Sequence, residues 1–347
     1  MDTNSAQLLI SRSTPFFVAQ RDVQVAVSFE VDRQELSAEV IGHAASPLQN
    51  QILAVKESVK DPGWRRSTHE AHMQKIREAN PIPKVDGSVD VFPSKLIVGF
   101  AHGLKMRPRP ILQSYAAFTP ELIERDAEHF RGDNAPDHVL ISVGQIDGRL
   151  PTMEDSRAWF ELLSRYDLTD SSGEFLQLSR RPQPSLLLDD EPVIRKTVRW
   201  NEAVAVSDDL AGPVWCRIRI KSSLSGQVAS ILYRLPEIHL QTQVGDDQSD
   251  DRTYRLLPGA GEVGFLISPR VETRDDLVQL LRWSATSSLD GLRSENRVSS
   301  FSCSVAPESG GDLLFEPDIT VEFFGISRGD GRLHDSAPRT DVATLRH

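Results

Sequence analysis

The chain has 347 residues, of which 39% are hydrophobic and 26% charged, and its formal net charge is −11. The length exceeds the size at which a single hydrophobic core usually stops growing, so two domains are expected. The negative charge disfavours nucleic-acid binding, which needs clustered Lys and Arg, and no apolar run reaches the roughly 18 to 20 residues that cross a bilayer. The sequence contains no Walker loop, dinucleotide fingerprint or HExxH motif, so neither a cofactor nor a metal is expected.

The two cysteines, Cys216 and Cys303, are too few for a disulfide scaffold or a structural zinc site. Each lies on the apolar side of an alternating segment, which is typical of a strand with one face in the core. The pattern leaves two alternatives: a pair of buried thiols, or one bridge between two strands.

The first part of the chain contains one strand pattern and two helix patterns. Alternating apolar residues predict a strand over Val23–Asp32. Helical spacing predicts helices over Ser46–Lys60 and Ser67–Ala79, each with its serine as the N-cap.

From Val89 the chain alternates strands and helices with short joints. A strand at Val89 is followed by a helix that we expect to be mostly buried, with Ser94 as N-cap and Gly103 just after its end. Proline fixes φ and holds the preceding residue extended, so RPRPIL at 107–112 predicts a strand edge. The apolar run HVLISV at 138–143 predicts a strand covered on both faces. This order predicts parallel pairing with right-handed crossovers.

Two more helices and a hairpin complete this part. Thr119 followed by Pro120 predicts an N-cap and a first helical position, and the helix places Ile123, Ala127 and Phe130 on one face. DSRAWFELLSRY at 155–166 predicts a helix with one broad apolar face, formed by Ala158, Trp159, Leu162, Leu163 and Tyr166. The stretch 166–181 predicts a hairpin with its turn at SSGE.

After a stretch rich in proline and acid, the patterns change from helices to strands. Strands are predicted for VWCRIRIKSS, QVASILYRL, TYRLLPGAGEVGFLIS, FSCSVAP and ITVEFFGIS, and either a short helix or a wide connection for DDLVQLLRW. The sequence therefore predicts an α+β multidomain protein. Residues 1–182 form an α/β domain with a mixed or parallel sheet, 183–195 a linker, 196–327 an antiparallel β-sandwich of jelly-roll type, and 328–347 a loose tail.

A resemblance to a known group of proteins lies in the run IPKVDGSVDVFPSKLIVGFAHGLKMRPRPILQSYAAFTPELIERDAEHFRGDNAPDHVLI, in IDGRLP, in WFELLSRYDL and in GFLISPRVETRDDLVQLL. The order of PRP, QSY, FTP and APD resembles the soluble C-terminal part of uncharacterised bacterial multi-pass membrane proteins of glycosyltransferase-like organisation. The resemblance implies an extracytoplasmic location, periplasmic or at the cell surface. Because this sequence has no membrane segment, we expect an excised ectodomain or a free-standing relative, joined to a membrane only through a tether outside this chain.

The first candidate ligand site follows the prolines at 107–112. Ligands bind where strand ends meet helix starts in open α/β sheets, and Gln113, Ser114, Tyr115 and Thr119 occupy such a place. The alternative is structural: Thr119 caps its helix, Tyr115 packs, and the other two side chains satisfy the bend. Ser114 could act as a nucleophile, but it lacks a G-x-S-x-G turn and no sequence feature selects its base among His102, His129 and His138.

Loop carboxylates are the second candidate. Paired acids are required for glycoside cleavage, and five acids lie near predicted strand ends: Asp86, Asp90, Asp133, Asp137 and Asp147. Acids in loops are more often solvated turn formers. The acidic stretch Gly245–Arg252 lacks the spacing of a calcium loop, and His239 stands alone on its strand.

The third candidate is the outward face of a strand. If Cys216 faces the core, then Trp215, Arg217 and Arg219 lie on the opposite face. An aromatic ring beside cations can stack on a sugar and pair with its acidic substituents. The alternative is that another part of the protein covers the tryptophan.

Two functions follow from these observations. The absence of a catalytic motif and the resemblance favour an extracytoplasmic, non-catalytic module that binds a glycan or a partner protein for a bacterial envelope glycan-handling membrane protein. The alternative is a carbohydrate-active enzyme that uses the loop carboxylates of the α/β domain.

Overall fold

The computed structural model describes residues 16–17, 26–27, 61, 63–171, 173–206, 210, 212–233, 235–245, 251–286, 296–306 and 313–328. The chain divides into two compact units, Met1–Ala71 and His72–His347. In the first unit β1 (Phe16–Phe17) pairs antiparallel with β2 (Ala26–Val27), which lies inside the strand predicted at 23–32. The helix predicted at 46–60 and the tail after Arg328 lie outside the described residues.

Helix α2 (Trp64–Ala79) confirms the predicted helix but begins three residues earlier. Ser67 therefore lies inside the helix, where its hydroxyl donates to the carbonyl of Trp64, and the prediction that it is the N-cap is wrong. The side chain of Asp61 accepts from the backbone N–H of Gly63 just before the helix.

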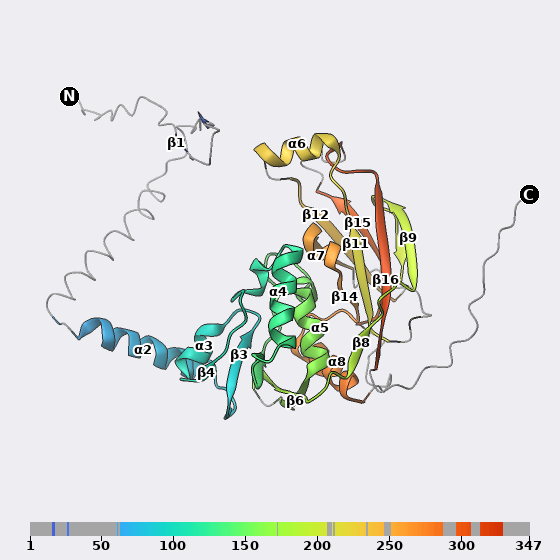
Figure 1. The fold of residues 1–347 in the computed structure, drawn as a ribbon. Helices are drawn as coiled ribbons and strands as arrows, with labels where there is room; N and C mark the ends of the chain where they lie inside the picture. The colour runs from blue at the N-terminus through green and yellow to red at the C-terminus, as the bar shows by residue number, and fades with distance from the viewer. Residues whose placement is uncertain are drawn as a thin grey trace, which may run out of the picture. The chain divides into compact units, whose positions relative to one another are not determined.

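The α/β part of the second unit is built on a mixed sheet (Figure 1). The order of its described strands is β4 (Lys105–Met106), β3 (Ser88–Phe92), β5 (His138–Ile141), β7 (Leu176–Arg180) and β6 (Tyr166–Asp170). Strand β3 runs parallel to β4 and β5, and the hairpin β6–β7 continues the sheet antiparallel. The predicted parallel pairing and the hairpin are confirmed.

The strand predicted at RPRPIL is wrong. The strand that pairs with β3 ends at Met106. One further hydrogen bond joins the N–H of Arg107 to the carbonyl of Val89. The chain then turns inward, because Pro108 and Pro110 have no N–H to continue the ladder. It reaches the single-turn helix η1 (Ser114–Ala116).

Helices α3 (Leu96–Ala101), α4 (Pro120–Arg131), η2 (Pro151–Met153) and α5 (Ser156–Arg165) accompany the sheet, and α4 and α5 lie side by side (Figure 1). The hydroxyl of Thr119 accepts from the N–H of Leu122 at 3.4 Å, and Pro120 begins α4, as predicted. The predicted apolar faces of α4 and of the 155–166 segment are both buried.

Helix α3 departs from the prediction in two ways. Its N-cap is Lys95, and the carbonyl of Ser94 accepts from Leu96, so Ser94 is not a side-chain cap. The helix is also less buried than expected, since Ile97 and Phe100 are 46% and 58% exposed. Gly103 follows the helix with φ +67°, a conformation that favours glycine, as predicted.

The rest of the second unit is rich in antiparallel strands and forms no barrel among its described residues. One sheet has the order β10 (Val204–Ala205), β15 (Val298–Val305), β12 (Ile238–Val244) and β13 (Arg252–Leu256). The other has β14 (Phe265–Ser268), β11 (Val214–Arg219), β16 (Asp318–Arg328) and β8 (Leu186–Leu188), and β9 (Ile194–Arg199) also pairs with β16. The protein is thus mixed α+β with several antiparallel sheets.

The core of this part contains both cysteines. Residues of both antiparallel sheets share one buried apolar cluster, in which the rings of Phe301 and Phe323 meet edge to face with centroids 6.1 Å apart. Cys216 and Cys303 belong to the same cluster as free thiols, so no bridge joins them. Burial raises the pKa of Cys216 well above its ordinary range and that of Cys303 to about 12.

Two predicted strands are wrong. The segment predicted as QVASILYRL is the helix α6 (Leu224–Leu232), which begins because the hydroxyl of Ser223 accepts from the N–H of Gly226 at 3.1 Å. The long strand TYRLLPGAGEVGFLIS is broken by α7 (Pro258–Val263), where Pro258 occupies the first helical position. Helix α8 (Arg274–Thr286) confirms the predicted DDLVQLLRW helix.

The predicted linker at 183–195 contains β8 and the first residues of β9, and both strands pair with β16. A second buried cluster joins α5 to the β-rich part: the rings of Phe160 and Trp215 meet edge to face with centroids 6.0 Å apart. The described residues after Ala71 belong to one compact unit, and the division into domains at the linker stays a prediction.

The position of α6 depends on a glycine. A Cβ at Gly226 would overlap the carbonyl of Leu314, so the helix lies against this backbone only because position 226 has no side chain. We expect Gly226→Ala to lower the free energy of unfolding by about 1–3 kcal/mol, the usual cost of overpacking. Urea denaturation measures this, with the exposed neighbour Gln227→Ala as the control; equal stability of the two variants would contradict the packing of α6.

Candidate functional site

The first predicted site, at Gln113 to Thr119, is a tightly bonded corner. Gln113 is exposed and accepts a hydrogen bond from the Tyr115 hydroxyl, while Thr119 serves as the cap of α4. Ser114 is fully buried, and its N–H donates to the carbonyl of Pro93. These contacts agree with the structural alternative, in which the residues cap a helix and satisfy a bend.

Ser114 belongs to a buried charge network centred on Arg109. The Arg109 guanidinium donates to Asp90 at 3.0 Å and to the Ser114 hydroxyl at 3.1 Å. Its Nε lies 3.5 Å from a carboxylate oxygen of Asp126 and 3.7 Å from one of Asp155. The guanidinium also donates to the carbonyl of Pro93. None of these charged side chains has solvent-exposed surface.

One guanidinium among three carboxylates leaves excess negative charge in a dry site. Burial raises the pKa of Asp155 well above its ordinary range, and it raises the pKa of Asp126 to about 6. The hydroxyl of Ser114 contacts Asp155 and Arg109, and no described histidine is hydrogen-bonded to it. The network is fully buried, which favours a structural role for Ser114.

The five loop carboxylates differ in burial and in their hydrogen-bond partners. Asp90 is enclosed in the Arg109 network, whereas Asp86, Asp133, Asp137 and Asp147 are exposed. Asp137 accepts from the N–H and the hydroxyl of Ser88, which lowers its pKa, and Asp147 pairs with Arg149 at 3.2 Å. Four of these acids therefore remain at the surface, where acids in loops commonly serve as turn formers.

A buried carboxyl that the sequence reasoning missed is Glu154, next to η2. One of its oxygens is buried without a hydrogen-bond partner among the described residues. Burial raises its pKa to about 7, although nearby Arg149 opposes the shift. A single glutamate in a loop gives no sequence pattern that predicts its burial.

At the third predicted site, another part of the protein covers the tryptophan. Trp215 is 1% exposed and packs against Phe160 of α5, so it cannot stack on a sugar. The alternation was read correctly, since Trp215, Arg217 and Arg219 do lie on the face opposite Cys216. Helix α5 covers that face at Trp215, and exposure increases along the strand to Arg219.

Beyond the covered tryptophan, cations from two strands surround one acid. Arg195 of β9 and Arg217 of β11 are cross-strand neighbours of Glu322 on β16, which lies between them. Glu322 is buried and pairs with Arg195 at 2.7 Å, with Arg219 at 3.3 Å and with Arg217 at 3.5 Å. The three arginine side chains are 61%, 43% and 23% exposed, respectively. Three cations against one carboxylate leave positive charge on this part of an acidic protein.

Arg157 of α5 adds a fourth cation. Its guanidinium lies 5.6 Å from the centre of the Trp215 ring, and that of Arg217 lies 4.8 Å from the centre of the Phe324 ring. Trp215 and Phe324 are cross-strand neighbours, so the two guanidinium groups lie above one aromatic pair. Arg157 makes no hydrogen bond or ion pair with any other described residue, and the Nε atoms of both arginines are buried without a partner. We call Arg157, Arg195, Arg217 and Arg219 the arginine face.

Burial lowers the pKa of Arg157, nearby Glu124 opposes this shift, and nearby Arg217 adds to it. A partly buried cation next to another cation is a place where an anion would be stabilised. The alternation of Arg217 and Arg219 is the sequence signal that pointed to this face. The contributions of Arg157 and Arg195 depend on tertiary contacts.

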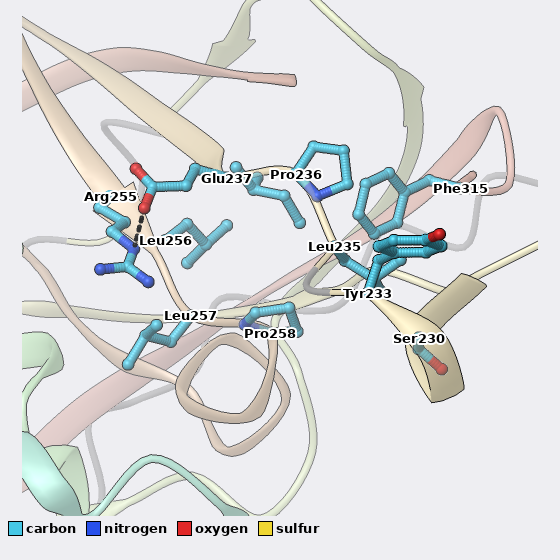
Figure 2. Close-up of a pocket in the computed structure, with 11 residues that line it drawn as sticks. Ser230, Tyr233, Leu235, Pro236, Glu237, Arg255, Leu256, Leu257, Pro258 and Phe315 are labelled. Carbon is cyan, nitrogen blue, oxygen red and sulfur yellow. Dashed lines mark ion pairs between the residues drawn. The ribbon is translucent and has the colours of Figure 1, made fainter. Parts of the chain in front are cut away.

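An apolar pocket of about 330 Å³ lies elsewhere, beside the C-terminal end of α6. Figure 2 shows Glu237 and Arg255 at one end, paired at 3.3 Å, and the rings of Tyr233 and Phe315 at the other. Leu235, Pro236, Leu256, Leu257 and Pro258 line the space between them. The sequence reasoning missed this pocket because it predicted α6 as a strand.

The described residues contain no group of three His, Cys, Asp or Glu side chains that could hold a metal ion, and none of their helices is long and apolar enough to span a bilayer. In comparisons with known proteins, no family model, no curated relative and no solved structure matches the chain. The function is therefore argued from the geometry of the arginine face.

The Arg109 network gives a stability prediction. We expect Arg109→Met to lower the free energy of unfolding by about 3–5 kcal/mol, because it leaves buried carboxylates without their cation. Guanidinium denaturation measures the loss, and Arg125→Met, at an exposed position of α4, serves as the control. A loss no larger than that of the control would contradict the central role of Arg109.

Glu154 gives a pH prediction. Its folded-state pKa of about 7 exceeds the ordinary value of 4.5, so the folded state binds this proton more tightly than the unfolded state. The protonated carboxyl therefore adds to the free energy of unfolding, by on the order of 3 kcal/mol. This stabilisation is fully present below the unfolded pKa and is lost as the pH rises through about 7. Asp126 acts in the same direction at lower pH.

We therefore expect Glu154→Gln to weaken the fall in thermal stability between about pH 5 and pH 8. The measurement is the melting temperature of both proteins across this range by calorimetry. Glu128→Gln, at an exposed position, should keep the pH dependence of the original chain. An identical slope for the original chain and Glu154→Gln would exclude this carboxyl as the cause.

Proposed function

We propose that the chain is a non-catalytic binding module that holds an acidic glycan on the arginine face. The observation that carries the proposal is the grouping of four guanidinium groups on one face. Three of them pair with the buried carboxylate of Glu322, and Arg157 makes no ion pair with a described residue. Guanidinium groups form paired, charge-assisted hydrogen bonds with carboxylate, sulfate or phosphate groups. A uronic acid residue would bring such a group together with sugar hydroxyls.

Neighbouring hydroxyl groups support a sugar ligand. Thr197 of β9 and Thr320 of β16 are cross-strand neighbours, and Thr320 is also the neighbour of Arg219 on β11. Thr197, Thr320 and Arg219 each lie two residues along their strands from Arg195, Glu322 and Arg217. The two sets of side chains therefore lie on the same face of the sheet. Hydroxyls beside cations suit a ligand with both hydroxyl and acidic groups.

Other parts of the proposal rest on the resemblance described above. We place the module outside the cytoplasm, periplasmic or at the cell surface, in association with a bacterial envelope glycan-handling membrane protein. We also assign the two antiparallel sheets to a β-sandwich of jelly-roll type. Their shared apolar cluster and the contact of Phe301 with Phe323 support this assignment.

The alternative, a carbohydrate-active enzyme that uses loop carboxylates, has weaker support. It needs two carboxyl groups facing each other across a cleft, about 5–10 Å apart. Asp90 is enclosed, and the other four candidate acids are exposed.

Titration calorimetry with an oligogalacturonate and a neutral oligosaccharide of equal length tests the binding function. We expect the acidic ligand to bind and the neutral one not to bind, and we expect binding to weaken with added salt, which screens exposed charges. Arg219→Gln should weaken binding about tenfold or more, because it removes one charge-assisted contact.

Lys196→Gln is the matched control, since it removes one positive charge from β9 at a position that pairs with the inward-facing Val321. Equal affinity for the two oligosaccharides would refute the proposal. An Arg219→Gln variant that binds as tightly as the Lys196→Gln variant would place the ligand elsewhere.

A further inference from the structure

The apolar face of helix α6 is turned away from the protein core. Leu224, Val228, Ile231 and Leu232 follow the spacing i, i+4, i+7 and i+8, which places them on one face. All four are exposed, by 62% to 83%. The buried residue of α6 is Gly226, which lies on the opposite side of the helix from this apolar stripe. A surface helix normally turns such a stripe towards the core.

Polar contacts and a close backbone approach hold the helix in this orientation. The hydroxyls of Ser223 and Ser225 both donate to the carbonyl of Leu313, each at 2.7 Å. Gly226 lies directly against Leu314. Tyr233, which follows the helix, is 76% exposed, and Leu313 is 79% exposed. Contiguous exposed apolar side chains of this kind mark a surface that another molecule covers.

The pocket described above lies on the other side of α6. Ser230 lines it from α6, four residues after Gly226 and therefore on the same helix face, and Pro258 and Phe315 line it from other parts of the chain. The surface left for another molecule is therefore the apolar stripe itself.

Charge decides which partner fits best. Residues Leu224–Leu232 include no acidic or basic side chain, whereas the chain as a whole carries −11. Two copies of an acidic chain repel each other over most of their surface, and an uncharged stripe is where they can approach without this cost. An anionic lipid surface is disfavoured by the net charge, and α6 lacks the Lys and Arg that interfacial helices use.

We propose that α6 pairs with α6 of a second copy of this chain around a two-fold axis. In such a pair the helices run antiparallel, and every contact occurs twice. Val228, near the middle of α6, faces its own counterpart, and Leu224 of each copy lies beside the C-terminal end of the other α6. The apolar stripe of each copy thus covers that of the other.

Sedimentation velocity over concentrations up to on the order of 100 µM tests the pairing. We expect a reversible dimer whose dissociation constant rises at least about tenfold in Ile231→Asp. Gln145→Asp adds the same charge at an exposed loop and should leave the dimer unchanged. Both changes replace exposed side chains, so circular dichroism should show an intact fold.

A cross-linking experiment gives an independent positive result. Under mild oxidation Val228→Cys should form a disulfide-linked dimer, whereas Glu128→Cys, exposed on α4, should not. Cys216 and Cys303 are buried and should remain free.

A chain that is monomeric at every concentration, or a dimer that Ile231→Asp does not weaken, would overturn the proposal. A monomer that binds neutral phosphatidylcholine vesicles, and loses this binding in Ile231→Asp, would replace the second copy by a lipid surface. Binding of oligogalacturonate should be unchanged in Ile231→Asp, so this test and that of the arginine face can fail separately.

Discussion

The α/β part depends on one buried cation. Arg109 meets Asp90 from β3, Asp126 from α4 and Asp155 from the start of α5, so a single guanidinium fixes three elements relative to one another. It also donates to the backbone carbonyls of Val91 and Pro93, at the end of β3, and of Leu112, just before η1. A buried ion group adds less stability than its contacts suggest, because each charge is first removed from water. Its main effect is to exclude other arrangements, since any shift of α4 or α5 leaves a buried carboxylate without its cation.

The partners of Arg109 could not be predicted from the sequence. Helix α4 and strand β5 were predictable because Thr119, Pro120 and a run of apolar residues each act locally. Arg109, between two prolines, is part of what looks like an exposed strand edge, and its partners lie 19, 17 and 46 positions away. Patterns of spacing carry no information about which distant carboxylates a loop will meet. The same limit applies to Trp215, whose face was predicted correctly but whose cover, α5, comes from earlier in the chain.

The error at α6 has a different cause. The segment contains apolar residues at spacings that suit either a strand or a helix, and the sequences on both sides are strands, so the pattern favoured another strand. What selects the helix is Ser223 as a cap and Gly226 at a close backbone approach. An apolar stripe usually faces the core, but the stripe of α6 faces outward. That rule therefore does not predict the orientation of this helix. A segment that breaks a local rule without an internal gain in packing is where an external partner is expected.

The arginine face and the apolar stripe of α6 differ in the side chains that they leave exposed. On the arginine face, helix α5 covers the sheet at Trp215 and leaves it open further along β11, so the buried end of the strand is aromatic and the open end is cationic. Around α6 no described helix covers the stripe, and the side chains that remain outside are apolar and uncharged. A charged ligand and an apolar partner therefore find separate surfaces on the same unit. Because neither surface includes a residue of the Arg109 network, both can be changed by substitution while the fold that supports them is kept.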